Sequence, residues 1–310
     1  MKTKPFILIA LFLSIALPIS CKNTDRVSSS QSDSDNSSNK ELLFTKKTGM
    51  VPYECKGAYA GKTVEIYYHI PNGDIKSMPV QIIMHGMNRN GDKYRDDWKD
   101  LANQYKFIVL APQFSQDEFS DAAYQQGNVV DNSGAFISPD AMIYPIISEV
   151  FHYFLDHSTS QATKFNIYGH SAGSQFVHRY LLFNKTPEVN KAVAANAGWY
   201  TFPNSNIAYP YGIGNSETII GVDVNGYYAK NLIVLLGTAD TERTSSMRQT
   251  KKADAQGINR FERGNNFFDY SQVDAARRGT PFRWQKAYVP GVGHSDSKMA
   301  PEAAKILYGK

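Results

Sequence analysis

The sequence predicts an α/β fold in which a mostly parallel sheet is covered by helices on both faces. Two observations support this class. From about residue 41, short apolar segments of strand length alternate with segments whose apolar residues have helical spacing. At residues 165–183 a strand, a glycine-rich turn and a helix follow one another directly. The composition, with 42% hydrophobic and 20% charged residues among 310, is that of an ordinary globular chain.

Seven apolar segments have the length and composition of buried or half-buried strands. Turn residues such as Pro71-Asn72-Gly73 separate the first of them from the next. The predicted strands cover residues 64–70, 80–84, 107–110, 165–168, 192–195, 232–236 and 282–289.

Four helices are predicted between or after these strands. The first is capped by Asp92, and its apolar residues recur at spacings of four, three and four up to Tyr105. The second covers residues 143–155 and the third covers residues 175–183. A last short helix is predicted within residues 301–309, between a proline and a glycine.

The N-terminal segment has the composition of an export signal followed by a tether. Two lysines precede an apolar run, residues 6–19, which has signal-peptide length and is too short for a comfortable membrane span. The sequence Leu17-Pro18-Ile19-Ser20-Cys21 resembles the lipobox of bacterial lipoproteins, which implies cleavage before Cys21 and lipidation of that residue. Residues 22–40 hold seven serines among polar residues, which predicts a flexible tether.

We therefore expect a lipoprotein signal peptide at residues 1–20, the lipidated Cys21 with its tether at 21–40, and one folded domain at 41–310. The protein is then exported and anchored to the cell envelope through its lipid, at the outer membrane. Either face of that membrane fits the sequence. The alternative is ordinary secretion with Cys21 free.

Charge and cysteine content exclude several function classes. A net charge of +4 over 310 residues makes no strong field, so no nucleic-acid partner is expected. The two cysteines are Cys21 and Cys55, and once Cys21 is lipidated no internal disulfide is possible. Cys55 is then expected to be a small buried residue. The sequence has neither an H-E-x-x-H motif nor a cysteine cluster, so no metal site is predicted.

The motif that indicates chemistry is Gly169-His170-Ser171-Ala172-Gly173. A strand enters it and a helix leaves it, which is the setting that a nucleophile elbow requires. On such a turn Ser171 projects above the sheet, while side chains at 169 or 173 would collide with the crossing backbone. The backbone N–H of Ala172, at the helix N-terminus, can bind an oxyanion. The alternative is a glycine-rich turn without chemistry.

Serine needs a base to remove its proton, and in this arrangement the acid and then the base follow it along the chain. Asp240 comes just after the apolar strand 232–236, and His294 lies in a glycine-rich loop after the strand 282–289. His170, inside the elbow, is expected to point away from the site. The loop after the strand 80–84 begins His-Gly-Met, which predicts the Met87 backbone N–H as a second oxyanion donor.

From about Val64 to Leu307 the chain resembles α/β-hydrolase-fold serine esterases, within them the polyhydroxybutyrate depolymerase-like and feruloyl-esterase-like branch. The segments that carry the resemblance are GHSAGSQFVHRYLLF, ANAGWYTFPN, ADAQGINRFERGNNFF and VPGVGHSDSKM. It implies a catalytic triad of Ser171, Asp240 and His294, no cofactor, and an ester substrate that is either a small molecule or a polymer.

Two aromatic residues are predicted to contact the substrate. Trp199 and Tyr200 follow the strand 192–195, at the same edge of the sheet as the nucleophile. A rigid indole suits an acyl chain or a phenolic ring, and core packing is the alternative for Trp199. The segment 241–279 is either an insertion over the site or a packed helix.

Three functions compete. The leading hypothesis is a lipid-anchored carboxylic ester hydrolase that acts through an acyl-enzyme. A serine peptidase of the same fold would need a site for the peptide N-terminus, often a Glu pair on a cap, and no such pair is evident. A surface binding protein that has kept the fold without activity is the third. The sequence predicts neither the natural ester nor an oligomeric state.

Overall fold

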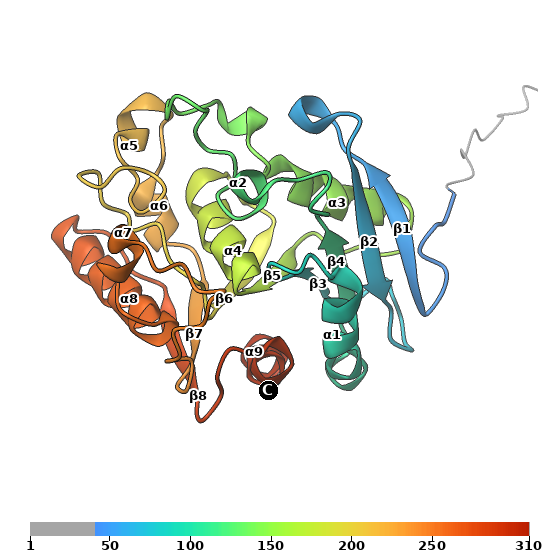
Figure 1. Ribbon diagram of the computed structural model, residues 1–310. Coiled ribbons are helices and arrows are strands. Elements are labelled where there is room, and N and C mark those ends of the chain that lie inside the picture. Colours follow the sequence, from blue (N-terminus) through green and yellow to red (C-terminus); the bar gives the residue numbers. More distant parts are fainter. Residues whose placement is uncertain (1–40, 310) are drawn as a thin grey trace, which may run out of the picture. The chain divides into compact units, whose positions relative to one another are not determined.

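The computed structural model describes residues 41–309, which form one eight-stranded sheet with helices on both faces (Figure 1). The sheet order is β1-β2-β4-β3-β5-β6-β7-β8, and all pairs from β4 to β8 are parallel. β2 is antiparallel to both of its neighbours. The predicted α/β class, with a mostly parallel sheet, is confirmed. The strands are β1 (Thr48–Glu54), β2 (Thr63–His69), β3 (Val80–Met84), β4 (Ile108–Gln113), β5 (Phe165–His170), β6 (Val189–Ala195), β7 (Leu232–Gly237) and β8 (Gln285–Val289).

Helices connect most of the strands, and two short 3₁₀ helices, η1 (Gly57–Tyr59) and η2 (Pro139–Ala141), lie in loops. The α-helices are α1 (Gly91–Tyr105), α2 (Asp121–Tyr124), α3 (Pro145–Asp156), α4 (Ala172–Phe183), α5 (Ser216–Ile219), α6 (Val224–Tyr228), α7 (Lys251–Asp254), α8 (Arg260–Arg277) and α9 (Asp296–Tyr308).

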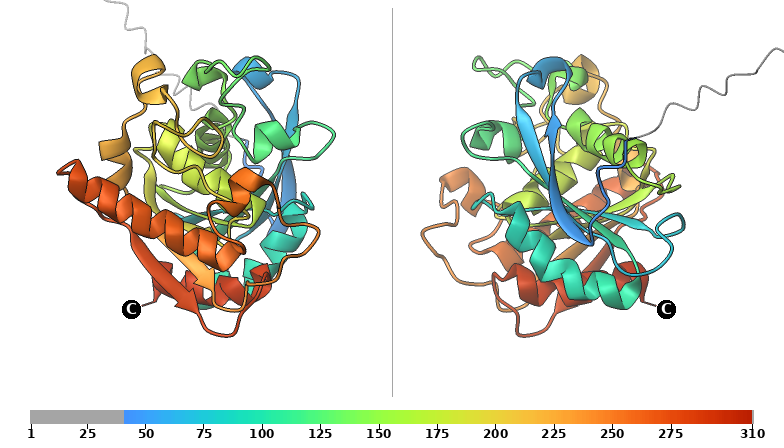
Figure 2. Two further views of the ribbon diagram at one scale, coloured as in Figure 1. Left: turned by 60° about the vertical axis from the view of Figure 1, so that its left-hand side comes forward. Right: turned by 90° about the vertical axis from the view of Figure 1, so that its right-hand side faces the viewer.

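Successive strand residues point to opposite faces of the sheet and so fill two cores. Ile83 and Val109 belong to the core beneath α1 and α9, two helices that pack side by side on one face (Figures 1 and 2). Ile82 and Leu110 belong to the other core, with residues of α3, α4 and α8. Figure 2 shows α8 running across the end of the sheet that β7 and β8 form.

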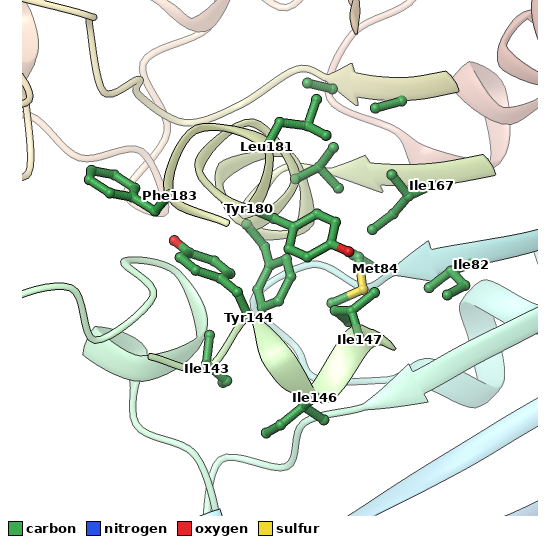
Figure 3. Packing of buried hydrophobic residues seen from close by; sticks show 14 of the residues in the cluster. Ile82, Met84, Ile143, Tyr144, Ile146, Ile147, Ile167, Tyr180, Leu181 and Phe183 are labelled. Carbon is green, nitrogen blue, oxygen red and sulfur yellow. The ribbon is translucent and has the colours of Figure 1, made fainter. Parts of the chain in front are cut away.

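The core between the sheet and helices α3 and α4 is closely packed (Figure 3). Ile82 and Met84 of β3 and Ile167 of β5 meet Ile147 of α3 and Tyr180 of α4, and all five side chains are fully buried. Burying one large apolar side chain contributes about 1.5–3 kcal/mol. This core therefore fixes the position of the turn between β5 and α4, on which Ser171 lies.

All seven predicted strands are present, with ends shifted by at most three residues. The four predicted helices are present, with starts shifted by two to five residues, and two of these shifts change the position given to a named residue. The last helix begins at Asp296, so Pro301 lies inside it. The first helix begins at Gly91, and Asn90 rather than Asp92 precedes it as the N-cap residue. The side-chain oxygen of Gln113, 2.9 Å from the Gly91 nitrogen, accepts the hydrogen bond of this first helical N–H, which has no partner within the helix.

Cys55 is buried and unpaired, as predicted, and burial raises the pKa of its thiol to about 12. Within residues 41–309, no helix combines the length and the apolar character that crossing a membrane requires. The predicted signal peptide, the lipidation of Cys21 and the tether lie outside the described residues, and all three stay predictions.

Candidate active site

Ser171 lies on the turn between β5 and α4, with φ 57° and ψ −115°. A positive φ strains a residue that carries a Cβ. A Cβ on Gly169 would clash with the Gly173 carbonyl, and a Cβ on Gly173 would clash with the carbonyl of Met84. The steric reason predicted for both glycines is therefore confirmed. The turn leaves Ser171 half-buried at the carboxyl edge of the sheet.

The structure brings the three predicted triad side chains into one hydrogen-bonded chain. His294 Nε2 lies 2.9 Å from Ser171 Oγ, and His294 Nδ1 lies 2.7 Å from Asp240 Oδ2. An ionised carboxylate only accepts hydrogen bonds, so Nδ1 carries the hydrogen and Nε2 accepts from the serine hydroxyl. The Asp240 carboxyl is buried, while a quarter of the His294 side chain is exposed.

The loops that carry the acid and the base are joined by their backbones. The N–H of Thr238 donates to the Val289 carbonyl at 3.1 Å, and the N–H of Ala239 donates to the Val292 carbonyl at 3.0 Å. Asn196, at the end of β6, links the same two loops: its Oδ1 accepts from the Gly237 N–H at 2.8 Å and its Nδ2 donates to the carbonyl before His294. The relative position of acid and base thus depends on the sheet as well as on their own contact.

Asp240 has a second charged neighbour that sequence reasoning missed. A terminal nitrogen of Arg260 lies 3.5 Å from Asp240 Oδ1, and both side chains are almost completely buried. The Arg260 guanidinium thus supplies a counter-charge on the side of the carboxyl that faces away from His294. No local sequence pattern predicts the pair of Arg260 and Asp240, because Arg260 begins α8, twenty residues after the acid.

His170 does not point away from the site, and that expectation is wrong. Its ring centroid lies 4.6 Å from that of His294, and its Nδ1 lies 3.3 Å from the hydroxyl of Tyr94. Burial, and as a smaller cause the neighbouring His294, hold the pKa of His170 well below its usual range. His170 is the last residue of β5, so its side chain points to the opposite face from Gly169 and packs beneath the base.

The loop after β3 comes close to the serine. A Cβ on Gly86 would lie 3.9 Å from the Cβ of Ser171, and Met87 and Ala172 both line the cavity beside the hydroxyl. The His85 ring holds this loop: its Nδ1 donates to the Gly86 carbonyl at 2.9 Å, and its Nε2 accepts from a backbone N–H at 3.0 Å. Burial lowers the pKa of His85 to about 3, so its ring is neutral and plays a positioning part.

A cavity of about 260 Å³ opens beside Ser171, and Trp199 lines it as predicted. Tyr200 does not. Its side chain is fully buried and stacks on Phe267 of α8, with ring centroids 4.5 Å apart. Tyr200 is therefore a packing residue. Trp199 lies at a bend after β6 and is itself only 2% exposed, because it packs on Tyr211, so the cavity meets only a small part of the indole.

The segment 241–279 combines both of its predicted alternatives. Its first part, residues 245–248, forms a wall of the cavity. Its second part is α8, which packs against β7 and carries Arg260. Within residues 41–309, no group of three or more His, Cys, Asp or Glu side chains is arranged to hold a metal ion.

A scan against models of protein families finds no match, and a search of curated proteins finds no significant match. Solved structures do match. Poly(aspartic acid) hydrolase-1 from Sphingomonas sp. KT-1 is 33% identical, with a TM-score of 0.78, over 85% of this chain and 100% of that chain. LpqC, the poly(3-hydroxybutyrate) depolymerase of Bordetella parapertussis, is 28% identical, with a TM-score of 0.79, over 84% and 89%.

More distant structures share the fold alone. The S-formylglutathione hydrolase FrmB of Staphylococcus aureus is 17% identical, with a TM-score of 0.51, over 84% of this chain and 96% of that chain. The sheet order and these similarities confirm the predicted α/β-hydrolase fold and define the protein as a hydrolase. The chain belongs to the same family of α/β-hydrolase-fold enzymes as poly(aspartic acid) hydrolase-1.

Proposed function

We propose that this protein hydrolyses carboxylic esters through an acyl-enzyme formed on Ser171. The observation that carries the proposal is the hydrogen-bonded chain from Ser171 through His294 to the buried Asp240. Serine, neutral imidazole and carboxylate in this order are the groups that turn a weak hydroxyl nucleophile into an effective one.

The reaction follows from the positions of these groups. Ser171 Oγ attacks the ester carbonyl while His294 Nε2 takes its proton, and Asp240 stabilises the imidazolium that forms. His294 then gives the proton to the departing alkoxide, which leaves as an alcohol. In the second half, His294 takes a proton from water, whose oxygen attacks the acyl-enzyme and releases the acid. His294 returns this proton to Ser171 Oγ, which restores the free hydroxyl.

We assign oxyanion stabilisation to the backbone N–H groups of Met87 and Ala172. Two observations support this role: both residues line the cavity beside Ser171, and Ala172 is the first residue of α4. The N–H groups at a helix start have no partner within the helix, and the helix dipole favours negative charge there. Such donors supply a large electrostatic part of the catalysis in acyl transfer.

The site is partly open to solvent on the side of His294, whose side chain is a quarter exposed. Two structures reported above are named for polymers: poly(3-hydroxybutyrate), whose units are joined by ester bonds, and poly(aspartic acid), whose units are joined by amide bonds. We propose a polymer or its soluble fragments as substrate, with Trp199 as a rigid wall of the cavity. A serine peptidase and an inactive binding protein are the competing functions.

We also propose that the chain is exported and anchored to the cell envelope, at the outer membrane, by a lipid on Cys21. The support is in the sequence: a basic start, an apolar run of signal-peptide length, and a small residue before the cysteine. More than one acyl chain is needed for firm anchoring, and bacterial lipoproteins normally carry several.

Hydrolysis of short 4-nitrophenyl esters, compared with peptide 4-nitroanilides, tests the proposed activity. We expect turnover of the esters, and a loss on the order of 10⁶ in kcat in Ser171→Ala, which removes one hydroxyl and little packing. A folded Ser171→Ala protein that keeps more than about a hundredth of the turnover contradicts the assignment. Faster cleavage of anilides than of esters favours the peptidase.

A further inference from the structure

Positive charge gathers around the cavity beside Ser171. Arg248 and Arg260 line the cavity directly. Arg179 lies next to it, with its guanidinium carbon 4.1 Å from the ring centroid of Trp199. Of these three arginines, Arg260 alone pairs with a carboxylate within residues 41–309, that of Asp240.

Arg179 is a buried cation without a carboxylate partner among the described residues. Its Nε donates to Thr201 at 2.7 Å, and one terminal nitrogen donates to the carbonyls of Gln125 and Gln175. The other terminal nitrogen is buried and has no hydrogen-bond partner within residues 41–309. A buried charge is normally paired, because leaving water without compensation is costly. The positive charge of Arg179, beside Trp199, is therefore not neutralised by a carboxylate among the described residues.

Arg248 adds a second uncompensated cation at the mouth of the same cavity. Its guanidinium carbon lies 5.1 Å from the ring centroid of Trp199 and 5.7 Å from that of Tyr211. The side chain is exposed, and within residues 41–309 its contacts are with these two rings, without a hydrogen bond or an ion pair. Two aromatic rings therefore hold a planar group whose N–H donors are free.

The cavity offers little to neutralise this charge. Among the described residues that line it, Asp121 is the one carboxylate, and its Oδ1 is already bound by Arg89 at 2.9 Å. The N-terminus of α4, at Ala172, adds a further positive end of a helix dipole. Each of these features favours an anionic group inside the cavity.

We propose that the cavity binds a carboxylate of the substrate through Arg248, so that the preferred substrates are esters with an anionic group close to the bond that is cleaved. The proposal rests on the ester hydrolysis proposed above. Arg248 and Ser171 line one cavity of about 260 Å³, so a small ligand reaches both. The planar guanidinium matches a carboxylate with two parallel hydrogen bonds, and the buried charge of Arg179 adds attraction without contact.

Two esters that differ in one charge test this proposal. 4-Nitrophenyl 4-carboxybenzoate and 4-nitrophenyl 4-carbamoylbenzoate have the same leaving group and nearly the same shape. Arg248→Met removes the guanidinium and keeps an apolar stem on the rings. Arg248→Lys keeps the charge and loses the planar fork. Lys251→Met is the matched control, because it removes one exposed positive charge three residues along the chain, outside the cavity lining.

We expect Arg248→Met to lower kcat/KM for the carboxylate ester about tenfold or more, and for the amide-bearing ester less than about threefold, on the scale of a hydrogen bond to a charged group. Arg248→Lys falls between wild type and Arg248→Met on the carboxylate ester. Lys251→Met leaves the ratio of the two esters unchanged. If Arg248→Met lowers kcat/KM equally for both esters, the proposal is overturned and Arg248 serves only to pack on Trp199.

Failure of the proposed hydrolysis has a different signature, since wild-type protein then cleaves neither ester. In that case calorimetric titration with benzene-1,4-dicarboxylate tests whether the cavity binds a carboxylate. Binding by wild type and by Lys251→Met that is lost in Arg248→Met supports the site. No binding by wild type overturns it.

Discussion

Replacing Asp240 by Asn separates two roles of this carboxylate, one toward His294 and one toward Arg260. The side-chain amide leaves His294 with the wrong tautomer, which lowers kcat by roughly 10⁴. It also leaves Arg260 buried without a counter-charge. At the 3.5 Å separation of this pair, an effective dielectric constant of ~20 gives an attraction of about 5 kcal/mol, and breaking buried pairs costs about 3–5 kcal/mol. Asp240→Asn is therefore expected to lose stability as well as turnover.

The two effects are measured separately, by hydrolysis of 4-nitrophenyl acetate and by denaturant unfolding followed by circular dichroism. The double variant Asp240→Asn/Arg260→Met removes both charges, so it should regain most of the stability and none of the activity. Asp254→Asn is the matched control, because Asp254 pairs with the buried Arg263 at 2.8 Å and does not contact His294. It should lose stability and keep turnover within about tenfold. If Asp254→Asn is the inactive variant, or Asp240→Asn keeps more than about a hundredth of kcat, the acid is misassigned.

Three further predictions concern stability and location. Burial raises the pKa of Asp296 to about 7, so the stability that depends on its protonated form is complete below about pH 4 and is lost as the pH rises through 7. The melting temperature of Asp296→Asn should therefore rise relative to that of wild type between pH 4 and pH 8. A difference in melting temperature that does not change with pH refutes this. Gly173→Ala should prevent folding, whereas Gly293→Ala, whose Cβ meets nothing closer than 3.5 Å, should fold; soluble yield and circular dichroism compare them. Cys21→Ala should release the protein from membranes in detergent-free fractionation and Cys55→Ala should not, so equal membrane retention of both contradicts lipid anchoring.

The features that the sequence predicts best are those that depend on residues close together in the chain. The apolar run of β5, the two glycines and the helix that follows identify the elbow, because the steric need for glycine at positions 169 and 173 arises within a few residues. Asp240 and His294 could be placed for a similar reason, since each follows a strand by a short turn, although only β7, before Asp240, is apolar and fully buried.

The features that the sequence does not predict depend on contacts between distant segments. Helix α8 has Arg260, Arg263 and Asp274 on its buried side, so its apolar periodicity is broken where it packs. Strand β1 lies at the edge of the sheet, and only two of its residues are buried.

The positions of polar residues around the site also depend on contacts between distant segments, so the sequence does not predict them. Arg248 lies in a loop without periodicity, so its position over Trp199 depends on the folded chain. The contrast between Trp199 and Tyr200 also appears only when the twist and path of the chain after β6 are known.

Covalent labelling with a fluorophosphonate, read out by mass spectrometry of peptides, tests most directly that Ser171 is an activated nucleophile. The folded protein should carry one adduct, on Ser171, and heat-denatured protein and Ser171→Ala should carry none, because a free serine hydroxyl is a weak nucleophile. His294→Ala should label far more slowly, since it lacks the base that removes the proton. A folded protein that stays unlabelled, or that is labelled equally in Ser171→Ala, would contradict the account.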